Sequence, residues 1–229
     1  MAGPRTPKGR ATVAVARLAE EYPGTADELC ALDHHGPFQL LVATILSAQC
    51  TDARVNMVTP TVFAAYPDAK ALAAAVPVEL EEMIRSTGFF RSKAASLIGM
   101  AQALVERFDG VVPEALEDLV TLPGVGRKTG NVVRSVAFGS PGLPVDTHVG
   151  RLARRLGLTV EDDPVKVERD LDALVAPAER GTLSLRLILH GRTVCKARSP
   201  RCDTCLLADI CPKVGVEPPL TGGRRRRSG

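Results

Sequence analysis

The chain of 229 residues lacks the long apolar run that a membrane-spanning helix needs, which is roughly 20 residues. Residues 1–10 also lack the apolar core of a secretion signal. Signals for β-hairpins are absent, runs that alternate between polar and apolar side chains are scarce, and no internal repeat is visible. These absences argue against a membrane protein and against a β fold. We therefore expect a soluble protein in a reducing compartment, the cytoplasm.

Helical periodicity, in contrast, extends over almost the whole chain. Apolar residues recur at spacings of three and four, in segments separated by Gly, Pro or Asp. The predicted helices are residues 11–22, 38–49, 52–66, 78–86, 91–108, 113–120, 127–138, 147–156, 164–175 and 182–192. The length and the 45% hydrophobic content suffice for one large or two small globular domains. The fold class that we expect is all-α.

The net charge of +3 is modest, but it is unevenly distributed along the sequence. Residues 1–122 contain 10 Lys and Arg against 15 Asp and Glu, whereas residues 123–229 contain 19 against 11. The net charge is therefore −5 over residues 1–122 and +8 over residues 123–229. We expect a basic, nucleic-acid-binding face on the C-terminal half of the molecule.

A glycine-containing turn lies directly before the predicted helix at residues 127–138. Pro123 restricts its own φ angle, and Gly124 and Gly126 permit positive φ and a close approach of the backbone to a bulky anion. The first N–H groups of the helix would point outward at its positive end, where a phosphate can bind. Glycine turns also join ordinary helix pairs, so the turn alone is weak evidence.

Lys128 and Asp146 are candidates for covalent chemistry near this turn. Lysines on a first helical turn usually extend into solvent. At Lys128, however, the positive end of the helix and the neighbouring Arg127 both disfavour a further positive charge, and a neutral amine is the nucleophile in Schiff-base chemistry. Asp146 directly precedes the helix predicted at residues 147–156, so its simplest role is that of an N-cap. A capping aspartate is held rigidly, which is compatible with catalysis.

Four of the six cysteines fall within one short segment, with the spacing C-x6-C-x2-C-x5-C. They are Cys195, Cys202, Cys205 and Cys211. Thiols this close together, in a chain without a secretion signal, indicate metal ligands rather than disulfides. Four thiolates suit tetrahedral zinc, but the spacing differs from the paired CxxC motifs of zinc sites. Residues 196–201 also carry three cations, Lys196, Arg198 and Arg201, which either present charge to phosphates or form an ordinary solvated loop.

Two segments together resemble the helix-hairpin-helix, Gly/Pro and aspartate motif of DNA glycosylases. They are LPGVGRKTG at residues 122–130 and VDTH at residues 145–148. The likeness is greatest to the endonuclease III family and extends over about residues 37–212. Further matching segments are ILSAQCTD at 45–52, GFFRSKA at 88–94 and LHGR at 189–192. The cysteine spacing resembles that of the family's [4Fe–4S] site.

The resemblance implies two helical domains with an active-site cleft between them. One would be a six-helix domain at residues 30–140, and the other an iron–sulfur domain at residues 11–29 and 141–213. Lys128 would be the nucleophile and Asp146 its catalytic partner. The family acts on oxidised pyrimidines in double-stranded DNA, removing the base and cleaving the abasic strand by β-elimination.

The resemblance also suggests residues that contact DNA. Gln49 would fill the gap left by a flipped nucleotide, Phe89 would act as a wedge in the opposite strand, and Ser47, Asp52 and His148 would surround the base. The other DNA contacts would be Gly124, Gly126, Arg127, Lys196, Arg198 and Arg201. Core packing is the alternative for Phe89, a surface amide for Gln49, and caps or satisfied polar groups for the three pocket residues.

Two residues depart from the family pattern. Val120 stands where relatives place a glutamate two residues before the hairpin leucine, so a carboxylate that could polarise the leaving base is missing. Phe89 stands where relatives often have leucine. These departures bear on lesion preference and on the rate of base removal more than on strand cleavage. The alternative functions are a monofunctional mismatch or adenine-type glycosylase, and a DNA-binding module without catalysis.

Both ends of the sequence are expected to be disordered tails, at residues 1–10 and 214–229, because they have few apolar residues to bury. Four arginines at 224–227 either add non-specific DNA affinity or form an inert basic end. We expect the protein to be a monomer that binds damaged DNA. If the source is bacterial, we expect it to be associated with the nucleoid.

Overall fold

The computed structural model describes residues 4–216 and contains no β-strand within that range. The α-helices are α1 (Pro7–Glu21), α2 (Ala26–Leu29), α3 (Gly36–Leu46), α4 (Asp52–Ala65), α5 (Ala69–Ala73), α6 (Pro77–Ile84), α7 (Phe90–Phe108), α8 (Leu116–Leu119), α9 (Arg127–Ala137), α10 (Thr147–Arg155), α11 (Pro164–Leu174) and α12 (Arg180–Thr193). Short 3-10 helices are η1 (Arg85–Thr87), η2 (Pro177–Glu179) and η3 (Cys202–Thr204). The all-α prediction is confirmed.

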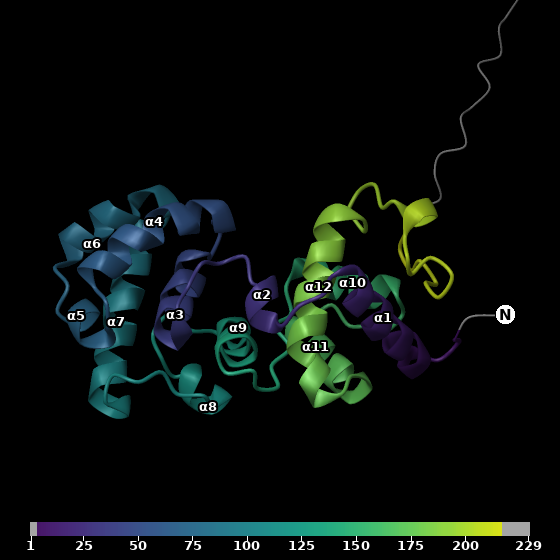
Figure 1. Ribbon diagram of the computed structural model, residues 1–229, viewed down its shortest axis with the longest axis horizontal. Helices are drawn as coiled ribbons and strands as arrows, with labels where there is room; N and C mark the ends of the chain where they lie inside the picture. The colour runs from purple at the N-terminus through teal and green to yellow at the C-terminus, as the bar shows by residue number, and fades with distance from the viewer. Residues whose placement is uncertain (1–3, 217–229) are drawn as a thin grey trace, which may run out of the picture.

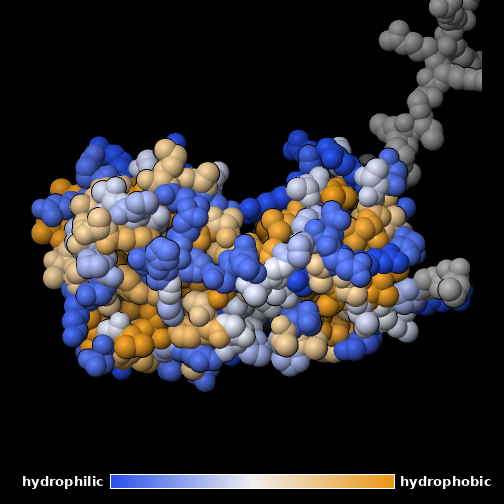
Figure 2. Space-filling view, in the orientation of Figure 1, coloured by the Kyte–Doolittle hydropathy of each residue, from blue (hydrophilic) through white to orange (hydrophobic). Residues whose placement is uncertain are grey.

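The helices form two lobes (Figure 1). The first lobe contains α3 to α8, the second contains α1, α10 to α12 and the cysteine segment, and α2 and α9 lie between them. The chain starts in the second lobe, passes through the first, and returns after α9. The space-filling outline is notched between the lobes (Figure 2).

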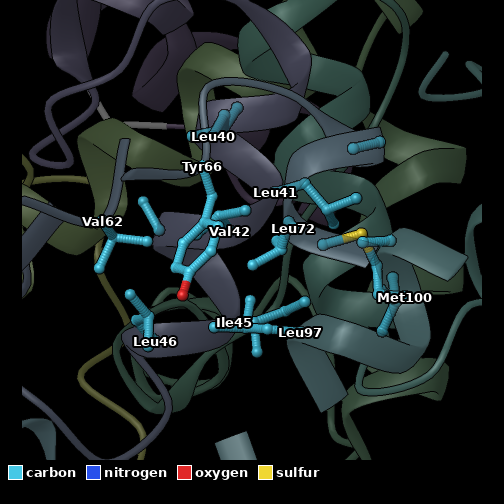
Figure 3. Close-up of a cluster of buried hydrophobic side chains, with 14 of the residues drawn as sticks. Leu40, Leu41, Val42, Ile45, Leu46, Val62, Tyr66, Leu72, Leu97 and Met100 are labelled. Carbon is cyan, nitrogen blue, oxygen red and sulfur yellow. The ribbon is translucent and has the colours of Figure 1, made fainter. Parts of the chain in front are cut away.

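Each lobe has its own hydrophobic core. The core of the first lobe is built largely from α3, α4, α6 and α7, where Leu40, Leu41 and Leu97 are fully buried and Met100 packs beside them (Figure 3). The core of the second lobe joins α1 to α10, α11 and α12 through side chains such as Leu18 and Leu152. Each lobe buries its apolar side chains in a core of its own. Polar side chains can therefore line the space between the lobes, where a site can form.

The predicted helices match the observed ones within a few residues, with three differences. The helix predicted at residues 113–120 is reduced to the single turn of α8, after the extended segment around Pro113. The helix predicted at 38–49 ends at Leu46, because the chain turns sharply before α4. Helices α2 and α5 were not predicted, since four or five residues are too few to show a period.

The prediction of a disordered tail at residues 1–10 is wrong for its second half. Helix α1 starts at Pro7, with Thr6 as N-cap. Arg10 donates hydrogen bonds to the carbonyl oxygens of Leu156 and Gly157 at 2.6 Å each, which fastens the start of α1 to the end of α10. These backbone acceptors lie about 146 residues away in sequence, so the sequence pattern did not reveal them.

At the C-terminal end of the described range, residues 214–216 form a turn. The Val214 amide donates a hydrogen bond to the Arg155 carbonyl oxygen at 3.3 Å. The four arginines at 224–227 lie outside the described residues. Among residues 4–216, no helix has both the length and the apolar character needed to cross a membrane.

Candidate active site

The two hairpin glycines have different conformations. Gly124 has φ +77°, and a Cβ atom there would lie 2.7 Å from the Cβ of Ser96, so this position requires glycine for conformation and for space. Gly126 has φ −87° and ψ 172°, an extended geometry open to any residue, and a Cβ there would meet nothing within 4 Å. Of the two glycines that permit positive φ, Gly124 adopts it, whereas Gly126 leaves the extended backbone open to a bulky anion.

Gly126 is the N-cap of α9, and no side chain caps this helix end. The first N–H groups of α9 therefore have no side-chain acceptor. Together with the positive end of the helix dipole, they are suited to bind a phosphate oxygen.

Arg127, a predicted DNA contact, is exposed and forms an ion pair at the start of α9. Its guanidinium donates two hydrogen bonds to the Glu168 carboxylate, at 2.8 and 2.9 Å, and the Glu168 side chain is only 8% exposed. This bond to Glu168 raises the pKa of Arg127. The pair joins α9 to α11, so Arg127 fixes the start of α9 while 49% of its side chain stays exposed to solvent. Lys128, the next residue, is exposed.

Asp146 is the N-cap of α10, as its position before the helix predicted. Its Oδ1 accepts a hydrogen bond from the Val149 amide at 2.8 Å, and the residue is half-buried. The carboxylate therefore has one oxygen fixed by the helix, and the capping role is confirmed.

Lys128 and Asp146 line the same cavity, which has a volume of about 520 Å³. The lining comes from the start of α9, the start of α10, the start of α11 and the end of α12. Its members are Lys128, Val145, Asp146, Thr147, His148, Gly150, Arg154, Asp162, Pro164, Val167 and Arg192. The structure thus brings together an amine and a carboxylate that are 18 residues apart in sequence.

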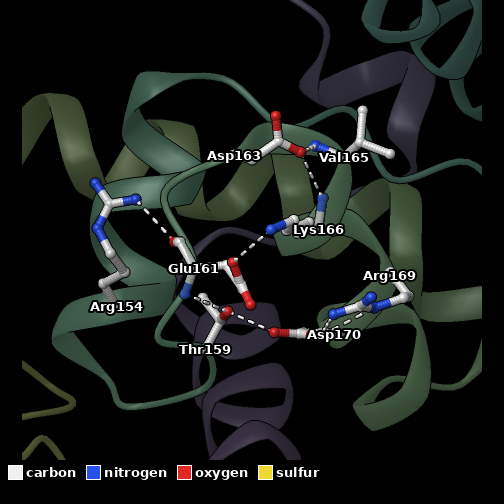
Figure 4. Close-up of polar contacts among 8 residues, drawn as sticks. All are labelled: Arg154, Thr159, Glu161, Asp163, Val165, Lys166, Arg169 and Asp170. Atoms are coloured by element: carbon white, nitrogen blue, oxygen red, sulfur yellow. Dashed lines mark hydrogen bonds and ion pairs between the residues drawn. The ribbon is translucent and has the colours of Figure 1, made fainter.

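One wall of this cavity is the connection between α10 and α11, and polar contacts hold it in place (Figure 4). Thr159 donates to the Asp170 carboxylate at 2.6 Å, and this bond, with a further one from Arg169, lowers the pKa of Asp170. Asp163 caps α11 through the amides of Val165 and Lys166, at 3.1 and 3.0 Å. The wall is therefore a fixed structure and not a free loop.

The three predicted base-pocket residues are only partly brought together. His148 lines the cavity, and its Nδ1 lies 3.1 Å from the Arg151 guanidinium. Asp52 forms an ion pair with Arg192 at 2.9 Å, which links the start of α4 to the end of α12 across the two lobes. The Ser47 hydroxyl donates to the Thr44 carbonyl at 2.8 Å, which fits the alternative of a satisfied polar group.

Gln49 and Phe89 meet at a second cavity of about 270 Å³, which Gly124 also lines. Both have left-handed backbone conformations, with φ 54° for Gln49 and 48° for Phe89. The Phe89 side chain is 66% exposed, so its interpretation as a core residue is wrong. The Gln49 amide forms no hydrogen bond within residues 4–216 and is exposed, so it is available to a ligand.

The four clustered cysteines line one small cavity between the end of α12 and the final turn of the second lobe. Burial raises the pKa of the Cys205 and Cys211 thiols, so their thiolates need a compensating positive charge. Arg155 donates to the Cys195 sulfur at 3.3 Å, and the His190 Nε2 lies 3.3 Å from the Cys205 sulfur. Nitrogen atoms placed against sulfur suit a thiolate-bound metal group.

The spacing of these thiols along the chain, C-x6-C-x2-C-x5-C, resembles that of a [4Fe–4S] site and differs from the paired CxxC motifs of zinc sites. A zinc ion binds four thiolates at one point, whereas each thiolate of a [4Fe–4S] site binds a different iron atom. The residues therefore fit a cluster, whose thiolate–iron bonds would hold the cysteine segment in shape when it is bound.

Lys196, Arg198 and Arg201 are all exposed on this segment. No ion pair formed within the described range involves them, so they are available to phosphates. The sequence pattern missed Arg192 and Lys93, which both lie in motifs shared with the family. Arg192 pairs with Asp52, and one acceptor of Lys93 is Leu46, both far away in the chain, so only the resemblance of the two segments to the family could have pointed to these residues.

Known proteins support this interpretation of the site. Residues 42–177 match the family model of the HhH-GPD superfamily base excision DNA repair protein, and residues 195–211 match the iron-sulfur binding domain of endonuclease III. Endonuclease III from a Synechocystis strain is 54% identical over 90% of this chain and 93% of its own length. Endonuclease III from Escherichia coli K12 is 40% identical over 85% of this chain and 91% of its own length.

Among solved structures, a trapped covalent intermediate of endonuclease III with DNA superimposes with a TM-score of 0.83. That protein is 41% identical, and the match covers 90% of this chain and 96% of the other. The cysteine cavity and the match to the iron-sulfur domain agree on a [4Fe–4S] cluster as cofactor. With the family model matching more than half of its residues, the chain belongs to the endonuclease III family of HhH-GPD base excision DNA repair proteins.

Proposed function

We propose that this protein removes oxidised pyrimidines from double-stranded DNA and then cleaves the abasic strand, with Lys128 as nucleophile and Asp146 as its catalytic partner. The observation that carries the proposal is the cavity that both residues line, at the junction of three helix starts. A single chain supplies both groups, so the enzyme acts as a monomer on chromosomal DNA in the cytoplasm. The family's glycosylase and lyase activities account for an amine and a carboxylate at one site.

The reaction starts with rotation of the damaged nucleotide out of the duplex, because its sugar is shielded within the stack. The lone pair of the Lys128 amine forms a bond to C1′ while the bond from C1′ to the base breaks and its electron pair leaves with the base. Asp146, fixed by its hydrogen bond to Val149, stabilises the positive charge that develops on the sugar.

The sugar ring then opens to an imine between Lys128 and C1′. The Asp146 carboxylate accepts a C2′ proton, the electron pair of that C–H bond forms a double bond between C2′ and C3′, and the 3′ phosphate leaves with the electron pair of its C3′–O bond, which is β-elimination. Water then hydrolyses the imine and releases the Lys128 amine. His148 and Arg192 line the same cavity and would face the sugar and the extruded base when DNA is bound. Each step uses groups that this chain supplies at the cavity.

DNA would be held at three places. The uncapped start of α9 with Gly124 and Gly126 binds one phosphate, and the exposed cations of the cysteine segment bind others. Gln49 and Phe89 enter the duplex at the flipped nucleotide. Arg127 contributes indirectly, through its bond to Glu168, because that bond fixes the first turn of α9.

Preference for oxidised pyrimidines rests on the family, and Val120 is the residue that bears on it. Val120 is 41% exposed at the end of α8, with no carboxylate at this position to polarise a leaving base. We expect Val120→Glu to accelerate base removal without changing cleavage of a preformed abasic site.

Strand cleavage with and without alkali tests the function directly. A duplex with one thymine glycol and a duplex with one abasic site are each incubated with the protein, and cleaved strands are separated with or without hot alkali. The proposal predicts cleavage of both duplexes without alkali. Cleavage of the first duplex only after alkali would indicate a monofunctional glycosylase, and binding without cleavage of either would indicate a non-catalytic module.

A further inference from the structure

A buried lysine lies beneath the two residues proposed to enter DNA. Lys93 is on the first turn of α7 and is 5% exposed. Its ammonium donates hydrogen bonds to the carbonyl oxygens of Leu46, at 2.7 Å, and Thr87, at 2.9 Å. No carboxylate within the described residues forms an ion pair with it. Burying an ammonium without a carboxylate is costly, so these two carbonyls carry its stabilisation.

The two carbonyls end two different helices. Leu46 is the last residue of α3, and Thr87 is the last residue of η1. Helix C-termini carry partial negative charge and unsatisfied carbonyl groups, which favour a cation. A single ammonium therefore caps both helices and fixes the distance between their ends.

From these ends the chain reaches Gln49 after three residues and Phe89 after two. The two residues share the left-handed backbone and line one cavity, which Lys93 also lines. The amide of Lys93 donates to the Phe89 carbonyl at 3.0 Å, so its main chain and its side chain both hold this segment. Left-handed conformations of residues other than glycine cost energy and persist only where the surroundings hold them.

We propose that Lys93 is a positioning residue that sets the spacing between Gln49 and Phe89, so that both enter the duplex at the flipped nucleotide in one step. The inference rests on the proposed function, because it takes Gln49 and Phe89 as DNA contacts. Lys93 itself is buried and touches no substrate.

The proposal predicts which step fails when the ammonium is removed. Lys93→Met leaves two buried carbonyls without a donor, and the two segments lose their common support. Rotation of a nucleotide out of paired DNA depends on both segments, because they replace lost stacking and pairing. A nucleotide that is already unpaired does not need this help, so attack by Lys128 on it should continue.

The test compares two DNA substrates in the same protein preparations. An abasic site is placed opposite adenine in a fully paired duplex, or within an unpaired bulge. The rate at which the borohydride-trapped adduct forms is measured under single-turnover conditions for the wild type, Lys93→Met and Lys93→Gln. Lys70→Met, on the exposed side of α5, is the matched control. The ratio of the two rates does not depend on how much of a variant is folded.

We expect both Lys93 variants to slow trapping on the paired duplex by about tenfold, with less than about a threefold change on the bulge. A 2-aminopurine opposite the abasic site should also show a smaller fluorescence rise, because its unstacking requires Phe89 and Gln49. Equal losses on both substrates, or no loss on the paired duplex, would overturn the proposal. If the wild type gives no adduct with either substrate, the proposed function itself fails.

Discussion

Asp146 has two roles in this structure, as the cap of α10 and as a lining residue of the cavity with Lys128. The roles are separable because asparagine caps helices about as well as aspartate but carries no negative charge. We expect Asp146→Asn to keep the stability of the wild type and to slow base removal by about 100-fold, since charge stabilisation in the transition state is lost.

Asp68→Ala provides the matched control for this prediction, because Asp68 caps α5 in the same way and lies in the first lobe, away from the cavity. It should lose about 1 kcal/mol of unfolding free energy and keep its activity. Urea denaturation and single-turnover excision measure the two quantities. Asp146→Asn with full activity would limit Asp146 to a capping role.

Lys93 makes the unfolding free energy of the protein depend on pH in the alkaline range. Burial lowers the pKa of Lys93 in the folded state below its ordinary value of 10.5. Between the lowered pKa and 10.5, the unfolded chain binds more protons, so this residue contributes more stability as the pH rises. A neutral amine still has two N–H groups for the two carbonyls.

The unfolding free energy of the wild type minus that of Lys93→Met should therefore increase as the pH rises toward 10.5. The difference isolates Lys93, because all other groups titrate in both proteins. Urea denaturation at a series of pH values from neutral to 10.5 measures it. A difference that stays constant or falls would show that the ammonium is not destabilised by burial.

Local sequence identified Lys128, Asp146 and the four cysteines because each is tied to a feature within a few residues: a glycine turn, a helix start or a short spacing. It gave no sign of the bond between Arg127 and Glu168, which is 41 residues away, and it gave no role to Lys93, whose acceptor Leu46 is 47 residues away. Contacts at such separations form only when helices pack, so no local pattern encodes them.

Among the elements, the hairpin before α9 depends on its two glycines in different ways. Gly124→Ala introduces a methyl group 2.7 Å from the Ser96 side chain at positive φ, and we expect it to lower the unfolding free energy by about 1–3 kcal/mol. Gly126→Ala fits its extended conformation and open surroundings, so it should leave stability unchanged.

DNA affinity should behave differently from stability. At Gly126 the new methyl group would stand where a phosphate approaches the uncapped end of α9, so affinity for DNA of any sequence should fall by about tenfold. Thermal denaturation and fluorescence anisotropy with a duplex oligonucleotide separate the two effects. Unchanged affinity in Gly126→Ala would place the DNA backbone away from this turn.

Over the whole molecule, charge is unevenly divided between the two halves of the chain. The net charge of +8 lies in residues 123–229, which include the three exposed cations of the cysteine segment. Replacing Lys196, Arg198 and Arg201 by glutamine should weaken binding to all sequences alike. The slope of log affinity against log salt concentration should become shallower by about 2 to 3, near 0.9 for each lost phosphate contact.

Anisotropy titrations at several salt concentrations measure this slope. The triple variant should keep the visible absorbance of the iron–sulfur cluster, because the four ligands are unchanged. An unchanged slope with intact absorbance would show that the segment faces away from DNA.

The overall architecture was predictable to a large degree. Helical periodicity indicated the fold class, since most helices bury one face against a core. No local sequence pattern encodes how the two lobes are arranged. It depends on contacts such as Asp52 with Arg192 and Arg10 with the end of α10, which join segments from distant regions of the chain.

The central claim is that Lys128 forms a covalent bond with the sugar, and borohydride trapping tests it most directly. The protein is incubated with a duplex that contains an abasic site, borohydride is added, and the adduct is digested for peptide mapping by mass spectrometry. We predict one adduct, with the modification on Lys128, and its loss in Lys128→Ala. An adduct of undiminished yield in Lys128→Ala, or a modification mapped to another lysine, would contradict the claim.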